Sequence, residues 1–155
     1  MSELLNAKPF PISKIIERLN SSIDRRDLDS VSSTAQYASI KALKDFRPKT
    51  AYVLLSNERW NGEPVKAGRQ GMIVNFGVVI AVSNYRDIRK GAETAEELDP
   101  LVDMVRGNLI GWTPPDISGA RSIQLLEGNV LDYDENTLLW MDVYQTQHFI
   151  GVGRG

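Results

Sequence analysis

The sequence contains no cysteine and only one histidine, His148. The lack of cysteine excludes disulfide bonds, thiolate nucleophiles and cysteine metal sites from this stretch of chain. A histidine metal site or a Ser-His-Asp triad would have to be built around His148, and no HExxH or similar spacing accompanies it. We interpret His148 as an ordinary surface or strand-end histidine, and we expect neither a metal ion nor enzymatic activity.

An excess of basic charge and long apolar runs are missing as well. The formal net charge is −2 at pH 7, so no overall positive charge favours binding to a nucleic-acid backbone. No run approaches the ~20 apolar residues of a membrane span, and the first residues lack the apolar core of a signal peptide. The sequence therefore predicts a soluble protein, made in the cytoplasm, with no membrane partner.

The remaining composition is that of a globular domain. Of the 155 residues, 42% are hydrophobic and 25% are charged, which is ordinary for a soluble protein. This length fits one core, and the sequence shows no linker or internal repeat. We expect a single domain over residues 1–155, with flexible ends at about residues 1–9 and 149–155.

Residues 71–86, GMIVNFGVVIAVSNYR, form the most informative stretch. Every second position is apolar, which is typical of a strand with one buried face: Met72, Val74, Phe76, Val78, Ile80 and Val82. We assign Phe76, Val78 and Ile80 to the structural core. The apolar run would span about 36 Å, long enough for the strand to extend past its own core and contact another subunit.

The rest of the chain predicts helices alternating with pairs of strands. Helices are expected at 12–23, 34–46 and 98–109. Strands are expected at 51–57, at 122–127 with a continuation over 129–133, and at 138–147. This order predicts an α+β fold, with a mostly antiparallel (mixed) sheet and helices packed on one face.

Four segments carry a resemblance to a known family. They are AYVLLSNE at 51–58, GVVIAVSNYRD at 77–87, LIGWTPP at 109–115 and LWMDVY at 139–144. As an ordered set over roughly residues 50–145, they resemble the tail terminator proteins of long-tailed bacteriophages and Mu-like prophages.

The resemblance implies a function in virion assembly. Such a protein forms a homohexameric ring on the last ring of the tail tube, stops tube polymerisation and offers a docking surface to head-completion (connector) proteins. It is a structural protein of the head-proximal end of the tail, assembled in the bacterial host cytoplasm. The resemblance implies no catalysis, no cofactor and no small-molecule substrate, and DNA would pass through the ring without specific binding.

The polar loop Glu58–Gln70 is the first candidate interface with a partner. Arg59 and Trp60 are adjacent in it, and Lys66 and Arg69 follow nearby. Tryptophan and arginine are enriched at protein interfaces. In the alternative interpretation, Trp60 folds back onto the edge of the domain's own core.

A basic cluster follows the long strand and is the second candidate interface. Arg86 and Arg89 in this cluster would contact a neighbour or line a lumen, and a solvated charge cluster is an equal interpretation. The glycine-rich run around Lys66 is not a phosphate-binding loop, because the lysine precedes the glycine and a strand follows.

Two tryptophans and one acidic residue complete the candidate core. Trp112 and Trp140 are interpreted as core aromatics. Asp142 lies among apolar neighbours and needs a polar partner if it is buried. No second catalytic group is evident beside it, so we favour a structural ion pair over a general base.

Three other functions are weighed against that of a tail terminator. Another ring protein of the head–tail junction would share the size and the oligomeric habit. A small hydrolase would combine the carboxylates of Asp132, Asp134 and Glu135 with His148, although a solvated hairpin turn also explains these acids. A host binding module without enzymatic activity is the third alternative.

Overall fold

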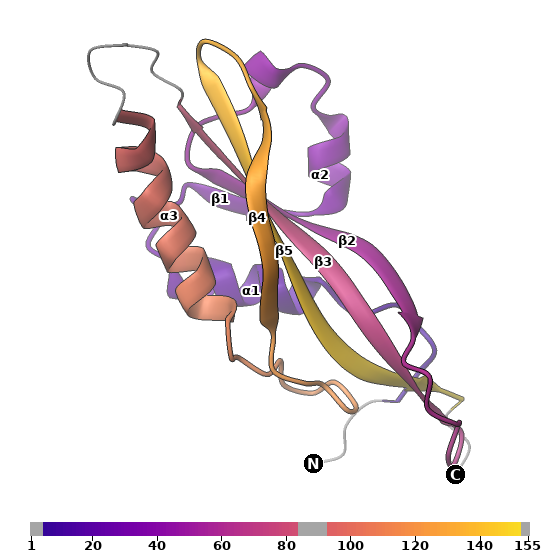
Figure 1. The fold of residues 1–155 in the computed structure, drawn as a ribbon. Coiled ribbons are helices and arrows are strands. Elements are labelled where there is room, and N and C mark those ends of the chain that lie inside the picture. The colour runs from indigo at the N-terminus through magenta and orange to yellow at the C-terminus, as the bar shows by residue number, and fades with distance from the viewer. Residues whose placement is uncertain (1–4, 84–92, 153–155) are drawn as a thin grey trace.

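The computed structural model describes residues 5–83 and 93–152, which form an α+β fold around one mixed sheet (Figure 1). The five strands lie in the order β1-β2-β3-β5-β4. Their bounds are Ser30–Ser32 for β1, Thr50–Trp60 for β2, Arg69–Ser83 for β3, Gln124–Tyr133 for β4 and Thr137–Gly151 for β5. The helices are α1 (Ser13–Ser22), α2 (Thr34–Ser39) and α3 (Glu93–Leu109), with a short 3-10 helix η1 (Leu43–Asp45). The predicted fold class is confirmed.

Strands β3 and β5 form the centre of the sheet. They pair antiparallel over 15 residues each, with Phe76 opposite Tyr144. The apolar residues at every second position of β3 face one side of the sheet and are fully buried there: Val74, Phe76, Val78, Ile80 and Val82. The alternation in the sequence therefore corresponds to the inner face of β3.

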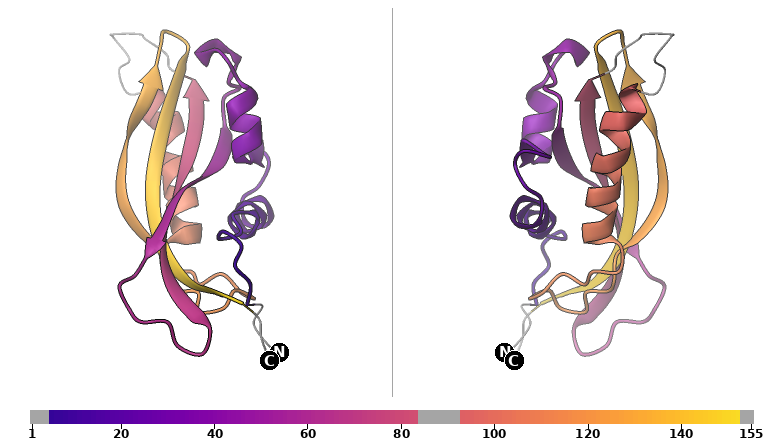
Figure 2. Two further views of the ribbon diagram at one scale, coloured as in Figure 1. Left: turned by 90° about the vertical axis from the view of Figure 1, so that its right-hand side faces the viewer. Right: turned by 90° about the vertical axis from the view of Figure 1, so that its left-hand side faces the viewer.

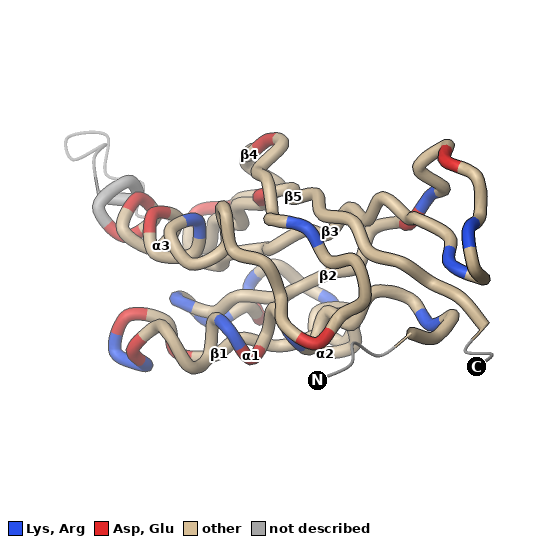
Figure 3. Tube along the Cα trace, turned by 90° about the horizontal axis from the view of Figure 1, so that it is seen from below, with Lys and Arg blue, Asp and Glu red and all other residues tan. Residues whose placement is uncertain are grey.

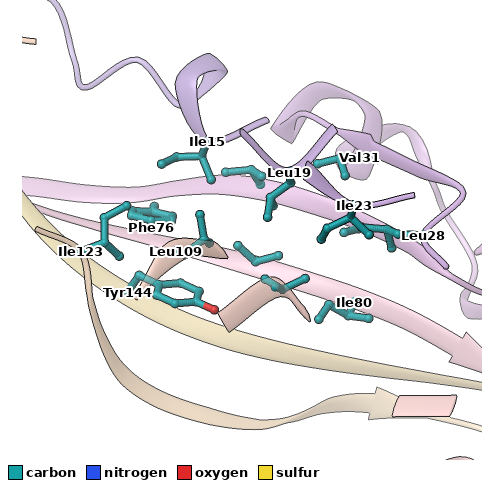
Figure 4. Close-up of a cluster of buried hydrophobic side chains, with 14 of the residues drawn as sticks. Ile15, Leu19, Ile23, Leu28, Val31, Phe76, Ile80, Leu109, Ile123 and Tyr144 are labelled. Carbon is teal, nitrogen blue, oxygen red and sulfur yellow. The ribbon is translucent and has the colours of Figure 1, made fainter. Parts of the chain in front are cut away.

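Helices α1 and α3 cover this inner face. Figure 4 shows Ile15 and Leu19 of α1 and Leu109 of α3 directed toward Phe76 and Tyr144 of the sheet. The apolar residues of α1 recur every three or four positions and so line one side of the helix. Each such side chain contributes about 1.5–3 kcal/mol when it is removed from water.

Part of the opposite face is covered by α2 and η1. Tyr37, Phe46 and Tyr52 meet there with their ring centroids 5.6–5.7 Å apart. They pack on Val79 and Leu139 of the sheet. The helices therefore lie on both faces of the sheet and not on one face as predicted: α1 and α3 share one face, and α2 packs on the other, where it covers Val79 and Leu139.

The predicted helix over 34–46 is interrupted. Ile40 is extended, with φ −86° and ψ 116°, and separates α2 from η1. Tyr37, Ile40, Leu43 and Phe46 are spaced by three residues and all join the same cluster. That spacing suits a 3-10 turn better than the 3.6-residue period of an α-helix.

Several boundaries also differ from those predicted. Residues 30–32 form the short β1, which pairs parallel with β2 and gives the sheet its mixed character. The long hairpin continues through Trp60 and resumes at Arg69, so its connection is 61–68 rather than the whole Glu58–Gln70 segment. β5 continues to Gly151, four residues past the predicted end. No helix in the described ranges is both long and apolar enough to cross a membrane.

Candidate assembly surfaces

The far end of the β2–β3 hairpin extends past the helices (Figure 2). We call residues 59–70 the arm. Lys66 and Arg69 exchange backbone hydrogen bonds of 3.1 and 2.9 Å across a tight turn at its end. The two central residues, Ala67 and Gly68, have φ values of 52° and 75°, as a type I′ turn requires. The turn fixes Lys66 directly opposite Arg69.

Trp60 lies on the arm and not in the core. It is 54% exposed and belongs to neither buried cluster. Its indole Nε1–H donates a hydrogen bond of 2.8 Å to the backbone oxygen of Glu63, which is part of the arm. The alternative in which Trp60 folds back onto the core is therefore wrong. Val65, farther along the arm, is also exposed.

The arm carries positive charges without acidic partners. Arg59, Lys66 and Arg69 are all exposed, and none of them joins an ion pair within the described part of the chain. Figure 3 shows these basic positions gathered at one end of the molecule. Like charges directly opposite each other on paired strands are destabilising. The Lys66–Arg69 pair therefore favours an acidic partner outside the protomer.

A buried cluster holds the base of the arm in place. His148 is only 4% exposed, and its Nε2 lies 2.7 Å from Glu58 Oε2. The same carboxylate oxygen accepts a hydrogen bond of 2.9 Å from the backbone N–H of Phe10. The Phe10 ring stands perpendicular to the imidazole, at 5.5 Å between centroids. The interpretation of His148 as a surface histidine is wrong, because β5 continues beyond it and its inner face is covered there.

The second surface is β4, at the opposite edge of the sheet from β1. Among the described strands, β4 pairs only with β5, and two register shifts interrupt the pairing, between Leu125 and Glu127 and between Val130 and Asp132. The extra residues of these bulges are Leu126 and Leu131. Bulges re-aim side chains, and both leucines point to solvent, with exposures of 48% and 42%.

The same edge is acidic. Glu127 and Asp132 on β4 and Glu135 in the following turn are exposed, and there is no lysine or arginine between residues 122 and 153. Asp134 shapes the turn, because its Oδ1 accepts hydrogen bonds of 2.8 Å from the N–H groups of Asn136 and Thr137. No group of three or more His, Cys, Asp or Glu residues in the described ranges is arranged to hold a metal ion.

The structure does not assemble the hydrolase set weighed from the sequence. Asp132 pairs with Leu139 of β5, and His148 lies nine positions farther along that strand. Nine residues of an extended strand span about 30 Å. The imidazole and the acidic turn therefore lie at opposite ends of β5 and cannot act on one substrate. Arg86 and Arg89, the other sequence-derived interface candidates, lie outside the described residues.

Asp142 is fully buried and multiply hydrogen-bonded. Arg106 of α3 reaches its carboxylate through two nitrogens: Nε donates to Oδ2 at 2.9 Å and Nη2 to Oδ1 at 2.8 Å. Trp140 Nε1–H donates to Oδ1 at 2.8 Å, and the Tyr144 hydroxyl donates to Oδ2 at 3.1 Å. This network links α3 to the sheet.

The network changes the ionisation of its members. The hydrogen bonds to Asp142 raise the pKa of the Arg106 guanidinium. Burial, and after it the neighbouring Asp142 carboxylate, raise the pKa of the Tyr144 hydroxyl well above its ordinary value. Within the described ranges, every buried side-chain nitrogen and oxygen has a hydrogen-bond partner. The arrangement is that of a satisfied structural ion pair, because all of Asp142's neighbours are donors that hold it in place.

The two candidate core tryptophans are half-buried. Trp140 packs against the main core with its indole N–H on Asp142. Trp112 packs beside the same core, and the guanidinium carbon of Arg18 lies 4.8 Å from its ring centroid. A cation over an indole face is attractive, so Trp112 links the end of α3 to α1.

Sequence reasoning missed the β4 edge as a surface. The signal that could have found it is the absence of lysine and arginine between residues 122 and 153, set against the three basic residues of the arm. It also missed Arg106 as the partner of Asp142. Arg106 sits in the last turn of a helix, and nothing in the sequence says which strand that turn approaches.

Two comparisons with known proteins complete the description. A family model described as phage tail terminator protein matches residues 5–154 of this chain. A search of curated proteins found no match.

Proposed function

Because this chain belongs to the phage tail terminator family, we propose that it caps the tail tube, ends tube polymerisation and then offers a docking surface to head-completion proteins. The single observation that carries the proposal is the family match, which covers nearly the whole chain. The general role of a structural tail protein follows from membership itself. The position at the head-proximal end of the tail and the specific partners are our proposal.

The proposed mechanism is geometric. One surface of a ring of protomers fits the growing end of the tube, and the opposite surface does not repeat the tube subunit's contact, so addition stops. Ring closure follows if each protomer uses a heterologous interface whose rotation closes on itself. The exposed arm supports a role in such contacts, because it carries Trp60 and three basic residues that join no ion pair with any described residue.

The proposed assembly is a homohexamer. It would sit on the last ring of tube protein, bind a connector protein on its other side and let DNA pass through its lumen without specific binding. This places the protein in the virion after assembly in the bacterial cytoplasm. These contacts depend on matching surfaces and involve no chemical reaction, so no cofactor or small-molecule substrate is part of the proposal.

Electron microscopy of tails made without the protein tests the proposal. We expect tails of irregular, excessive length without heads, and restoration of normal length when the wild-type chain is supplied in trans. The nearest alternative is another ring protein of the head–tail junction. In that case tails lacking the protein would have the normal length and would only fail to attach to heads, which would overturn our assignment.

A further inference from the structure

We propose that the arm of one protomer docks on the β4 edge of a second copy of this chain, and that this contact repeats head to tail around the ring. The occupant of the β4 edge is therefore residues 59–70 of a neighbour. This inference identifies the contact between neighbouring protomers of the ring. It rests on the proposed function, because that function requires a ring.

Both surfaces expose large apolar side chains. Each bulge of β4 places one leucine in solvent, Leu126 and Leu131. The arm presents Trp60 and Val65, which pack on neither core cluster of their own protomer. Exposed edge strands invite pairing and proteins normally protect them with charges or a cover. Large exposed apolar side chains on such an edge mark an interaction site.

The charges of the two surfaces are opposite. Arg59, Lys66 and Arg69 on the arm have no acidic partner among the described ion pairs. On the β4 edge, Glu127 and Asp132 follow the bulges, and the sequence from 122 to 153 has no lysine or arginine. Arg106 of α3 reaches Gly128 of this strand, but its guanidinium is paired with Asp142. Complementary charges steer association and fix register. They also explain why the arm tolerates Lys66 and Arg69 opposite each other.

The placement of the surfaces requires a neighbour. In the sheet order, β3 and β5 separate β2 from β4. The arm lies at the end of the molecule opposite the β4–β5 turn (Figure 1), so one protomer cannot join its own two surfaces. A contact between two different patches is heterologous, and repeating it gives a closed ring or an open filament.

Disulfide trapping tests the contact, because the sequence has no cysteine of its own. Proteins carrying Val65→Cys and Leu126→Cys are mixed and oxidised. Docked thiols meet at an effective concentration in the millimolar range, so we expect the linked heterodimer in at least about tenfold higher yield than for the control mixture of Val65→Cys with Ser22→Cys. A chain carrying both Val65→Cys and Leu126→Cys should give a ladder of linked oligomers. Equal yields for the test and control mixtures overturn the proposal.

Charge reversal provides a second readout that misfolding cannot imitate. The triple variant Arg59→Glu, Lys66→Glu, Arg69→Glu and the double variant Glu127→Arg, Asp132→Arg are each combined with the trapping cysteines. We expect each to lower the trapped yield about tenfold against an unreversed partner, and the two variants mixed with each other to recover it. The control triple Arg25→Glu, Lys41→Glu, Lys44→Glu should trap normally. The proposal is contradicted if mixing the two reversed variants does not restore the trapped yield.

The two proposals fail in different ways. If the arm does not dock on β4 but the chain is a terminator, the reversed variants still restore normal tail length in trans. If the chain is not a terminator, trapping succeeds while tails made without the protein keep their normal length.

Discussion

Asp142 illustrates how a single acidic residue is held inside this fold. Its carboxylate is fully buried and accepts hydrogen bonds from Arg106, Trp140 and Tyr144. Taking an ion pair out of water costs free energy that good geometry only partly offsets, but removing one partner leaves an unpaired charge. The network therefore specifies how α3 sits on the sheet more than it adds to overall stability.

Gly128 is the residue on which this network depends most closely. A Cβ placed there would lie 2.5 Å from Arg106 Nη2, 2.6 Å from Asp142 Oδ1 and 2.8 Å from the Trp140 ring. We expect Gly128→Ala to lower the free energy of unfolding by about 1–3 kcal/mol, as overpacking does. Chemical denaturation measures the difference.

Gly107→Ala is the matched control for that substitution. Gly107 lies in α3, and a Cβ there meets nothing within 4 Å. Alanine in the middle of a helix is favoured over glycine by about 0.5–1 kcal/mol, and the gain is smaller in the last turn, so this variant should be at least as stable as wild type. A Gly128→Ala protein as stable as wild type would show that the network adjusts without cost.

Tyr144 should make stability depend on pH in the alkaline range. The pKa of its hydroxyl in the folded protein is raised above the ordinary value of 10.0, so above about pH 10 the unfolded chain loses this proton while the folded chain keeps it. The contribution of Tyr144 to the free energy of unfolding is constant below about pH 10. Above about pH 10 it falls by up to ~1.4 kcal/mol per pH unit. Tyr144→Phe should be less stable near pH 7 and should decline less steeply above pH 10. Denaturation series at successive pH values measure both slopes, and equal slopes would contradict the assignment.

Among the elements, the arm is the one whose removal should separate folding from assembly. We expect replacement of residues 62–70 by Asn-Gly, which suits a two-residue hairpin turn, to leave a folded monomer that neither forms a ring nor restores tail length. Circular dichroism, sedimentation velocity and tail-length measurement in trans check the three parts. Deleting the whole Glu58–Gln70 segment would be a poorer test, because Glu58 bonds His148 and Phe10 in the base of the arm.

Glu63→Ala serves as the control for the arm. Trp60 bonds the backbone oxygen of Glu63 and not its side chain, so the variant should keep the arm's shape and its basic charge. It should assemble like wild type. Normal capping by the shortened hairpin would exclude residues 62–70 of the arm from the interface.

The sequence predicts the elements whose pattern is set by their own residues. The period of two in β3 and the apolar stripe of α1 each follow from one buried face, and both appear where expected. Elements set by distant partners could not be found this way. β1 has three residues and exists through its pairing with β2, and Ile40 leaves the helical conformation where Tyr37 and Phe46 join the cluster on the far face.

The residues of the candidate surfaces also fall into two groups: those that the local sequence identifies and those that depend on contacts with distant parts of the chain. Arg59, Trp60, Lys66 and Arg69 could be named from the sequence alone, because they lie in the mostly polar stretch 56–70. The burial of His148 depends on Glu58, which is 90 residues away in the chain, and no local pattern indicates that contact. The outward leucines of β4 depend on bulges that appear only when β5 sets the register.

For the whole molecule, opposite charges on two separated surfaces predict that self-association depends on salt. Exposed charges are screened over about 10 Å at 0.1 M salt and over about 3 Å at 1 M. We expect association of the wild-type chain to weaken about tenfold or more between low and high salt. Sedimentation velocity at a series of NaCl concentrations measures this. Association that strengthens steadily with salt would indicate a contact that is apolar throughout.

The first and last described residues of the chain lie beside the arm. A Cβ at Gly68 would approach the backbone oxygen of Val152, and Gly151 lies against the Gly68 backbone and the Leu5 side chain. The N-terminal segment joins the same place, because the Gly151 N–H donates to the Asn6 oxygen. A purification tag or a fluorescent label attached near either end would therefore start beside the arm, where it would crowd the neighbour that we propose to dock there.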